Sequence, residues 1–227
     1  MNRRAQGGFT LIEVMIAIAV MTLMMVVAWG SVVQTMNAKK QFEAQQDRFR
    51  EARSALQRMT LDLEMAYLSA NEDRTLPDTR TFFNGSDSGS INSLKFSSFA
   101  HQRLYADANE ADSTVISYYE GSDRSHSAQK NLLRRETRRL SNEKPESIPG
   151  EADVLFSNVI KLHLSYFDVR DNEWKETWNT QGVEGSANRL PDRVRISLTF
   201  PDEVGKEVTL TTQAKIHLNE VVQSFAN

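Results

Sequence analysis

A long apolar run lies near the start of the chain. From Phe9 to Trp29, polar residues occur only at Thr10, Glu13 and Thr22. A helix of about 20 mostly apolar residues is long enough to cross the hydrocarbon core of a bilayer. The pattern therefore predicts a transmembrane helix over residues 9–29.

The helical pattern continues beyond this run, but it becomes amphipathic. Residues 30–70 contain no proline and are rich in Ala, Gln, Glu, Arg, Met and Leu, which favour a helix. The pattern places charged side chains on one face of this helix, and it predicts that the opposite, apolar face packs against a core. The apolar stripe consists of Phe42, Phe49, Leu56 and Leu63, spaced by seven, with Ala52, Met59 and Ala66 beside them.

The remainder of the chain, residues 71–227, changes to the two-residue alternation of half-buried strands. Residues 71–89 are polar and rich in turn formers, and 84–89 are predicted as a loop. The predicted strands are 91–99, 114–119, 132–138 (strand or turn), 160–166, 174–178, 194–200 and a hairpin partner starting at 208. Loops are predicted at 141–151, 170–173 and 201–206. The fold class is therefore α+β, with one long helix packed on a β-rich domain.

Glu13 places a carboxylate inside the apolar run. At the centre of a bilayer a carboxylate costs about 2.5–3.5 kcal/mol on insertion scales. Glu13 lies near one end of the run, so its side chain can also extend to the headgroups. An ionisable residue within a membrane segment favours a functional role, here a cationic partner.

Two further questions concern processing and orientation of this segment. A secretory signal peptide has about 7–15 apolar residues and a small-x-small cleavage site, whereas this run is longer and is followed by a poor site of that kind. Arg3 and Arg4 precede the run and favour a cytoplasmic N-terminus. Lys39 and Lys40, about ten residues beyond its far end, weaken that bias.

The junction before the apolar run resembles the leader of type IV pilins and type II secretion pseudopilins. Residues 3–14 are Arg-Arg-Ala-Gln-Gly-Gly-Phe-Thr-Leu-Ile-Glu-Val: a short basic leader, a glycine, and then Phe-Thr-Leu-Ile-Glu. The resemblance implies cleavage between Gly8 and Phe9 by a prepilin peptidase and N-methylation of the new Phe9 amine. It also implies that Glu13 pairs with the N-terminal amine of a neighbouring subunit. From this resemblance we also expect a pilin-like fold.

The C-terminal third is similar to the J-type minor pseudopilin of type II secretion, general secretion pathway protein J. The residues that carry this similarity are Phe167-Asp168, Asn172-Glu173-Trp174, Trp178, Leu190-Pro191, Val194, Ile196 and Leu198. Minor type IV pilins of the W type, which serve adhesion, motility or DNA uptake, share the length and plan and are the alternative. A membrane-anchored enzyme or sensor is a third possibility, but it leaves Gly8, Phe9 and Glu13 without an explanation.

The J-type resemblance implies the domain organisation, the function and the partners of the chain. It divides the chain into a cleaved leader (1–8), a transmembrane helix (9–29), its amphipathic continuation (30–70) and a periplasmic β-rich domain (71–227). The protein is then a non-enzymatic subunit at the tip of the pseudopilus, which helps export folded proteins across the outer membrane. Its partners are the I- and K-type minor pseudopilins, the major pseudopilin, the prepilin peptidase and the inner membrane. The N-terminus is cytoplasmic and the C-terminal domain periplasmic.

The composition of the chain excludes several kinds of binding and catalytic site. The chain has no cysteine, which excludes disulfides and thiolate metal sites, and its net charge of -3 gives no basic field for nucleic acid. The four histidines lack metal-ligand spacing, and the acidic run 107–112 lacks the features of a calcium loop. The cluster of Arg134, Arg135, Arg138 and Arg139 is interpreted as a solvated face or as salt bridges to a partner. We therefore expect no metal, no cofactor, no catalytic residue and no nucleic-acid partner.

Overall fold

The computed structural model describes residues 9–69, 81–87, 89–100, 113–122, 129–137, 151–181 and 186–218. The predicted leader with Gly8, the acidic run 107–112 and the predicted loop 141–150 lie outside these residues. So do Arg138, Arg139, His101 and His126. The chain divides into two compact units, Met1–Asp47 and Arg48–Asn227, which are described separately below.

Helix α1 (Leu11–Glu64) is continuous over 54 residues, which corresponds to about 80 Å of helix at 1.5 Å per residue. Its part in the first unit is exposed throughout, including the large apolar side chains of the Phe9–Trp29 run. By length and composition, α1 is the one helix in the described part of the chain that could cross a membrane. The predicted long N-terminal helix is therefore confirmed.

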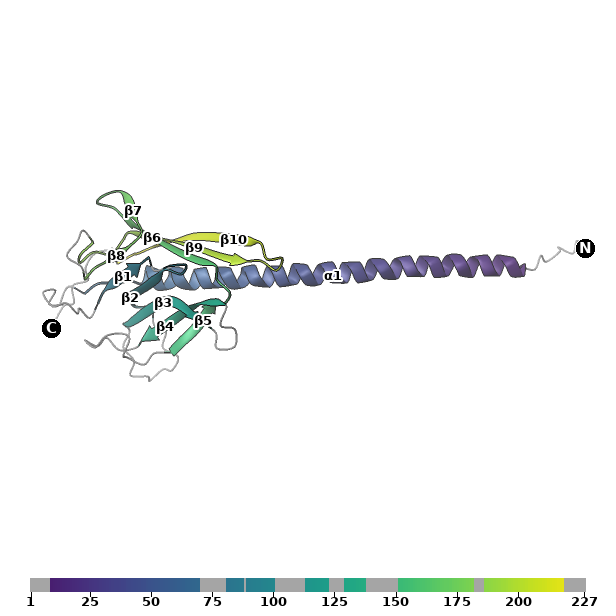
Figure 1. The fold of residues 1–227 in the computed structure, drawn as a ribbon, viewed down its shortest axis with the longest axis horizontal. Helices are drawn as coiled ribbons and strands as arrows, with labels where there is room; N and C mark the ends of the chain where they lie inside the picture. Colours follow the sequence, from purple (N-terminus) through teal and green to yellow (C-terminus); the bar gives the residue numbers. More distant parts are fainter. Residues whose placement is uncertain are drawn as a thin grey trace, which may run out of the picture. The chain divides into compact units, whose positions relative to one another are not determined.

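The second unit contains two antiparallel sheets (Figure 1). The six-stranded sheet has the order β5-β4-β3-β2-β1-β8, and the four-stranded sheet has the order β10-β9-β6-β7. The strands of the first are β1 (Phe83–Ser86), β2 (Ser93–Ser98), β3 (Thr114–Ser122), β4 (Lys130–Thr137), β5 (Glu151–Phe156) and β8 (Trp178–Asn179). Those of the second are β6 (Lys161–Asp168), β7 (Glu173–Lys175), β9 (Arg193–Pro201) and β10 (Glu207–Lys215).

The core of this unit lies between the inner faces of the sheets and the C-terminal part of α1. Strict alternation puts every second residue of β6 and β9 inside, as expected for strands with one solvated face. The two sheets also touch directly, because the rings of Phe83 and Tyr166 meet edge to face at 5.8 Å between centroids. The helix contributes Ala52, Ala55, Leu56, Met59 and Leu63 to the core. The predicted apolar stripe is therefore confirmed from Phe49 onward, whereas Phe42 is exposed.

The strand predictions were correct for β2, β3, β4, β6, β9 and β10, and three others need correction. Residues 84–86, predicted as loop, belong to β1, and β5 begins at Glu151, where the sequence predicted a loop. The predicted return strand 174–178 is split between the sheets. Trp174 lies in β7 beside β6, whereas Trp178 lies in β8 beside β1.

Gly85 explains why β1 resembles a loop in sequence. A Cβ atom at Gly85 would overlap the hydroxyl oxygen of Tyr166. The glycine therefore provides space for a buried tyrosine of the other sheet rather than a turn.

Candidate functional site

The predicted assembly residues lie at the start of α1. Thr10 precedes the first helical residue, and Glu13 is the third residue of the helix. The Glu13 backbone N–H donates to the Thr10 hydroxyl oxygen, and the Glu13 carboxylate accepts from the Thr10 backbone N–H, both at 3.4 Å. This reciprocal arrangement is a capping box, which satisfies two of the N–H groups that a helix start leaves unpaired.

The capping box determines where the Glu13 charge lies. The carboxylate also accepts a hydrogen bond from the Thr10 hydroxyl at 3.4 Å. A negative charge in the first turn is stabilised by the positive end of the helix dipole. The spacing Thr10-x-x-Glu13 is the sequence signal for this motif.

Apolar side chains lie around this carboxylate on one face of the first turns of α1. The side chains of Phe9 and Glu13 line a shallow depression with Val14, Ala17, Ile18 and Met21. Phe9 is 86% exposed. The structure thus brings together two of the three predicted site residues, Phe9 and Glu13, and Gly8 lies outside the described residues.

A buried carboxylate on α1 organises the second unit. Asp62 is completely buried within the apolar stripe. Its carboxylate accepts hydrogen bonds from the Tyr118 hydroxyl at 2.5 Å and from Arg134 Nε at 2.6 Å. Arg58 Nε lies 3.2 Å away on the same helix. Burial, reinforced by the Asp62 charge, raises the pKa of Tyr118 well above its ordinary value, so Tyr118 remains a hydrogen-bond donor.

Arg134 corrects the interpretation of the arginine cluster. Its guanidinium is not on a solvated face but bonds to Asp62 and, through Nη1, to Glu136 at 2.9 Å. The sequence pattern does not single out Asp62, because a carboxylate in a helix usually faces solvent.

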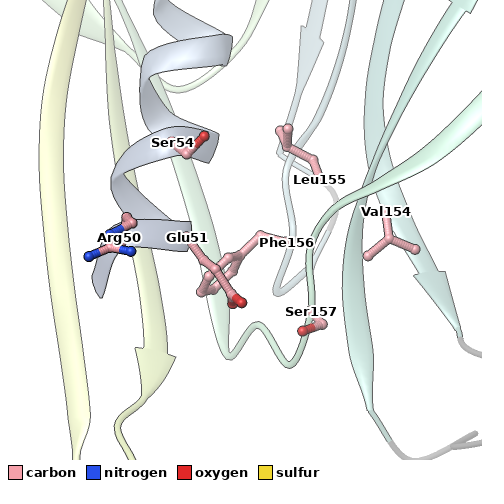
Figure 2. A pocket seen from close by; sticks show the side chains of 7 residues that line it. All are labelled: Arg50, Glu51, Ser54, Val154, Leu155, Phe156 and Ser157. Atoms are coloured by element: carbon pink, nitrogen blue, oxygen red, sulfur yellow. The ribbon is translucent and has the colours of Figure 1, made fainter. Parts of the chain in front are cut away.

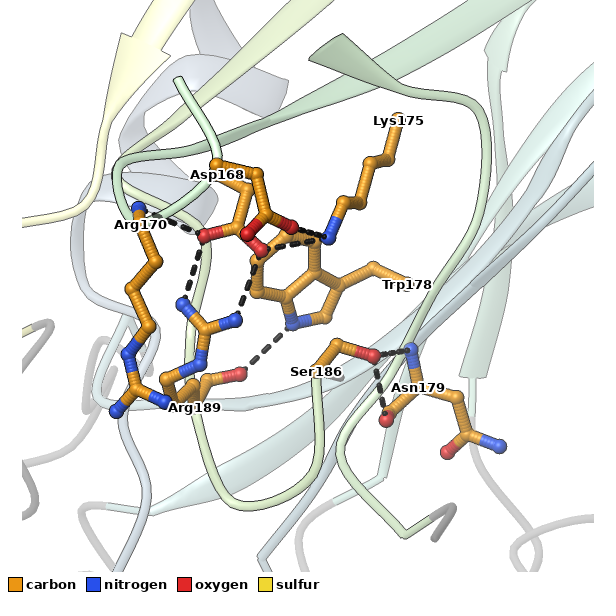
Figure 3. Close-up of polar contacts among 8 residues, drawn as sticks. Asp168, Arg170, Lys175, Trp178, Asn179, Ser186 and Arg189 are labelled. Carbon is orange, nitrogen blue, oxygen red and sulfur yellow. Dashed lines mark hydrogen bonds and ion pairs between the residues drawn. The ribbon is translucent and has the colours of Figure 1, made fainter. Parts of the chain in front are cut away.

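A second buried carboxylate, Asp168, organises the end of the four-stranded sheet (Figure 3). Arg189 donates two hydrogen bonds to it, both at 2.8 Å, and Lys175 Nζ donates a third at 2.8 Å. The Arg170 backbone N–H donates a fourth at 3.0 Å. The bidentate Arg189 contact, aided by Lys175, holds the pKa of Asp168 well below its usual range.

This cluster fixes the segment after β8. The indole Nε1 of Trp178 donates to the Arg189 carbonyl at 2.7 Å, and the Arg189 guanidinium lies 5.5 Å from the centre of the Trp178 ring (Figure 3). Of the motif residues, Trp178 and Leu190 are buried in the apolar core, and Asp168 is buried in this ion-pair cluster.

A groove lies beside the edge strand β5 of the second unit (Figure 2). It is lined by Arg50, Glu51 and Ser54 of α1 and by Val154 to Ser157. Arg48 contacts two of the lining residues, since its guanidinium stacks on Phe156 at 4.0 Å and donates to the Ser157 carbonyl at 2.6 Å.

A metal site requires several His, Asp or Glu side chains that lie close together. Among the described residues, no cluster of three His, Asp or Glu side chains is placed to hold a metal ion. His163 instead lies 3.1 Å from Glu176 on the outer face of the four-stranded sheet.

Comparison with known proteins identifies the family. The family model described as "Type II secretion system (T2SS), protein J" matches residues 30–210, and the "Prokaryotic N-terminal methylation motif" matches residues 3–29. No match was found among the curated proteins. A chain in the crystal structure of the GspK-GspI-GspJ complex from the type 2 secretion system of enterotoxigenic Escherichia coli is similar in structure. It shows 14% identity over 74% of this chain and 97% of that one, with a TM-score of 0.49. Because the first family model covers most of the sequence, the chain belongs to the protein J family of the type II secretion system, whose members are minor pseudopilins.

Proposed function

We propose that this minor pseudopilin is cleaved between Gly8 and Phe9, N-methylated at Phe9, and assembled into the pseudopilus through Glu13. The observation that carries the proposal is the capping-box carboxylate of Glu13, next to Phe9 at the start of an exposed apolar helix. A carboxylate in an apolar assembly needs a cation, and a methylated amine keeps its positive charge. The minor type IV pilin alternative is not favoured, because the matching family is the secretion family.

The remaining parts of the proposal follow from family membership. We place the N-terminus in the cytoplasm, the apolar helix in the inner membrane and the β-rich domain in the periplasm. The partners are the I- and K-type minor pseudopilins, with which this subunit forms the tip, and the major pseudopilin below them. The role is structural, without catalysis or a cofactor, and serves the export of folded proteins.

Processing is tested by mass spectrometry of the protein isolated from its native membrane. We expect a chain that begins with N-methylated Phe9. A chain that still begins at Met1, in cells with active prepilin peptidase, would contradict the proposal.

The role of Glu13 is tested by separating its charge from its capping function. Glu13→Gln retains the capping box, because glutamine replaces glutamate in this motif, but it removes the negative charge. We expect Glu13→Gln and Glu13→Leu to insert normally into the membrane. In each variant, the amount of partner pseudopilin that co-purifies and the amount of secreted protein should both fall by tenfold or more. Leaving a buried amine without its counter-ion costs about 3–5 kcal/mol.

Glu43→Gln is the matched control. Glu43 lies on the same helix in an exposed pair with Lys39 at 3.6 Å, and exposed pairs of this kind contribute little. Normal assembly by Glu13→Gln, with failure of Glu13→Leu alone, would show that only the helix cap matters and would refute charge pairing.

A further inference from the structure

The outer face of the four-stranded sheet carries a group of arginine and aromatic side chains. The inward residues of β9 are buried, so Arg193 and Arg195 point outward. In the strand register, Arg193 lies opposite Phe167 and Lys215, and Arg195 lies opposite Ser165 and Gln213. Directly opposed residues share one face of a sheet. We call this group the outer patch; it comprises Phe167, Trp174, Arg193, Arg195, Gln213 and Lys215.

The aromatic rings and guanidinium groups of the outer patch are stacked. Phe167 and Trp174 have ring centroids 5.2 Å apart. The Arg195 guanidinium carbon lies 4.0 Å from the centre of the Trp174 ring, and that of Arg193 lies 4.8 Å from the Phe167 ring. Ser165 points to the same face yet is only 3% exposed, which shows that larger side chains lie over it.

Stacking fixes the arginines but leaves hydrogen-bond donors unused. In the part of the chain that the structure describes, neither Arg195 nor Lys215 forms an ion pair, and Arg193 uses only Nε, at 3.0 Å from Asp192. A guanidinium held flat on a ring loses little further rotamer freedom when its edge binds a carboxylate. Half-buried Trp and Arg are also the residue types that dominate binding energy at protein interfaces.

We propose that the outer patch is a docking surface for an acidic, extended segment of a partner protein. Arg193 and Arg195 are two residues apart, so their side chains repeat at about 6.6 Å along the strand. Carboxylates on alternate residues of an extended segment have the same repeat and would meet both arginines. The exposed Lys215 extends the positive edge beside them.

A protein segment fits this patch better than nucleic acid. The two ring faces are occupied by guanidinium groups rather than open for base stacking, and the net charge of the chain is -3. The patch belongs to a different element from Glu13, so this inference stands or fails independently of the proposed assembly.

Fluorescence anisotropy with the full chain in nonionic detergent tests this surface. The probe is a labelled 12-residue peptide of alternating Glu and Thr, compared with alternating Lys and Thr. We expect binding of the acidic peptide alone, and a rise in its Kd of about tenfold for Arg195→Gln, the scale of one charge-assisted hydrogen-bonded pair. Lys161→Gln, an exposed cation on the same face at Thr199, should leave the Kd within twofold.

Lys215→Gln serves as a second variant, since Lys215 is exposed and its loss does not disturb packing. Circular dichroism checks that each variant is folded. Equal effects of Lys161→Gln and Arg195→Gln would overturn the proposal by showing only general charge attraction. Equally tight binding of a 12-nucleotide single strand or of phosphatidylglycerol vesicles, lost in the same variants, would overturn it by assigning the patch to another polyanion.

Discussion

Removal of the Asp62 carboxylate is the most informative perturbation of the second unit. Asp62 is completely buried and receives hydrogen bonds from Tyr118 at 2.5 Å and from Arg134 at 2.6 and 3.3 Å. In Asp62→Ala, the Arg134 guanidinium stays in a largely buried site, and among the described residues Glu136 is its remaining counter-ion. Removing one partner of a buried ion pair costs about 3–5 kcal/mol. This is a large share of the 5–15 kcal/mol that typically stabilises a domain.

The double replacement Asp62→Leu with Arg134→Met separates the charge from the packing. Apolar residues of similar volume often replace a buried ion pair without loss. Tyr118→Phe removes the buried hydroxyl that would otherwise lose its acceptor. In that background, we therefore expect the double variant to lie within about 1 kcal/mol of Tyr118→Phe alone or to be more stable. Asp62→Leu and Arg134→Met, each made singly in the same background, complete a double-mutant cycle. The non-additivity in this cycle measures the coupling between the two residues.

Urea unfolding of the full chain in nonionic detergent provides the assay. Near-ultraviolet circular dichroism and the fluorescence of the buried Trp178 report on the second unit. Arg58→Ala is the control: Arg58 also contacts Asp62, but it is 34% exposed, so its removal should cost less than about 1 kcal/mol. A cost below about 1 kcal/mol for Asp62→Ala, together with additive costs of Asp62→Leu and Arg134→Met in their double variant, would refute the claim that this buried pair couples the helix to the sheet.

Two further predictions concern the four-stranded sheet and its contact with β1. Gly85→Ala should destabilise the second unit by about 1–3 kcal/mol through overpacking against Tyr166. Gly30→Ala, a helix position with no atom within 4 Å of the added methyl, should instead be neutral or stabilising by up to about 1 kcal/mol; equal melting temperatures for both variants would contradict this reasoning. The pKa of Asp168 is lower in the folded state than in the unfolded state. Its charge therefore stabilises the fold above about pH 4, where the carboxyl of the unfolded chain ionises. This stabilisation is lost as the pH falls further, through the folded-state pKa. Asp168→Asn should therefore be less stable than the wild type at pH 7, and the gap between their unfolding free energies should narrow below pH 4; a gap that stays constant down to pH 2 would show that the charge of Asp168 is not what stabilises the sheet.

The sequence predicted the elements whose patterns are long and regular. The seven-residue spacing of Phe49, Leu56 and Leu63 identified the packed part of α1, and alternation identified β6, β9 and β10. In each case a single face is buried over several turns or residue pairs, so the period of the element appears directly in the order of apolar residues.

The sequence did not predict the features that depend on distant partners. The strand β1 contains Gly85, a residue typical of turns, and its glycine is explained only by the Tyr166 ring of the other sheet. Asp62 interrupts an apolar stripe, and its partner Arg134 is 72 residues away. By contrast, the capping box of Thr10 and Glu13 is local, so it could have been predicted from the spacing alone.

The two buried aspartates have a common physical role that apolar packing alone does not supply. Apolar contacts between a helix and a sheet depend weakly on direction, so a helix rotated about its axis can bury a similar area. A buried carboxylate is satisfied only where its donors converge, and a rotated helix would leave both Asp62 and Arg134 uncompensated. Asp168 constrains the segment after β8 in the same way through Arg189 and Lys175. The ion pairs of this unit therefore contribute mainly to a single arrangement of helix and sheets, and the stability itself comes from the apolar core between them.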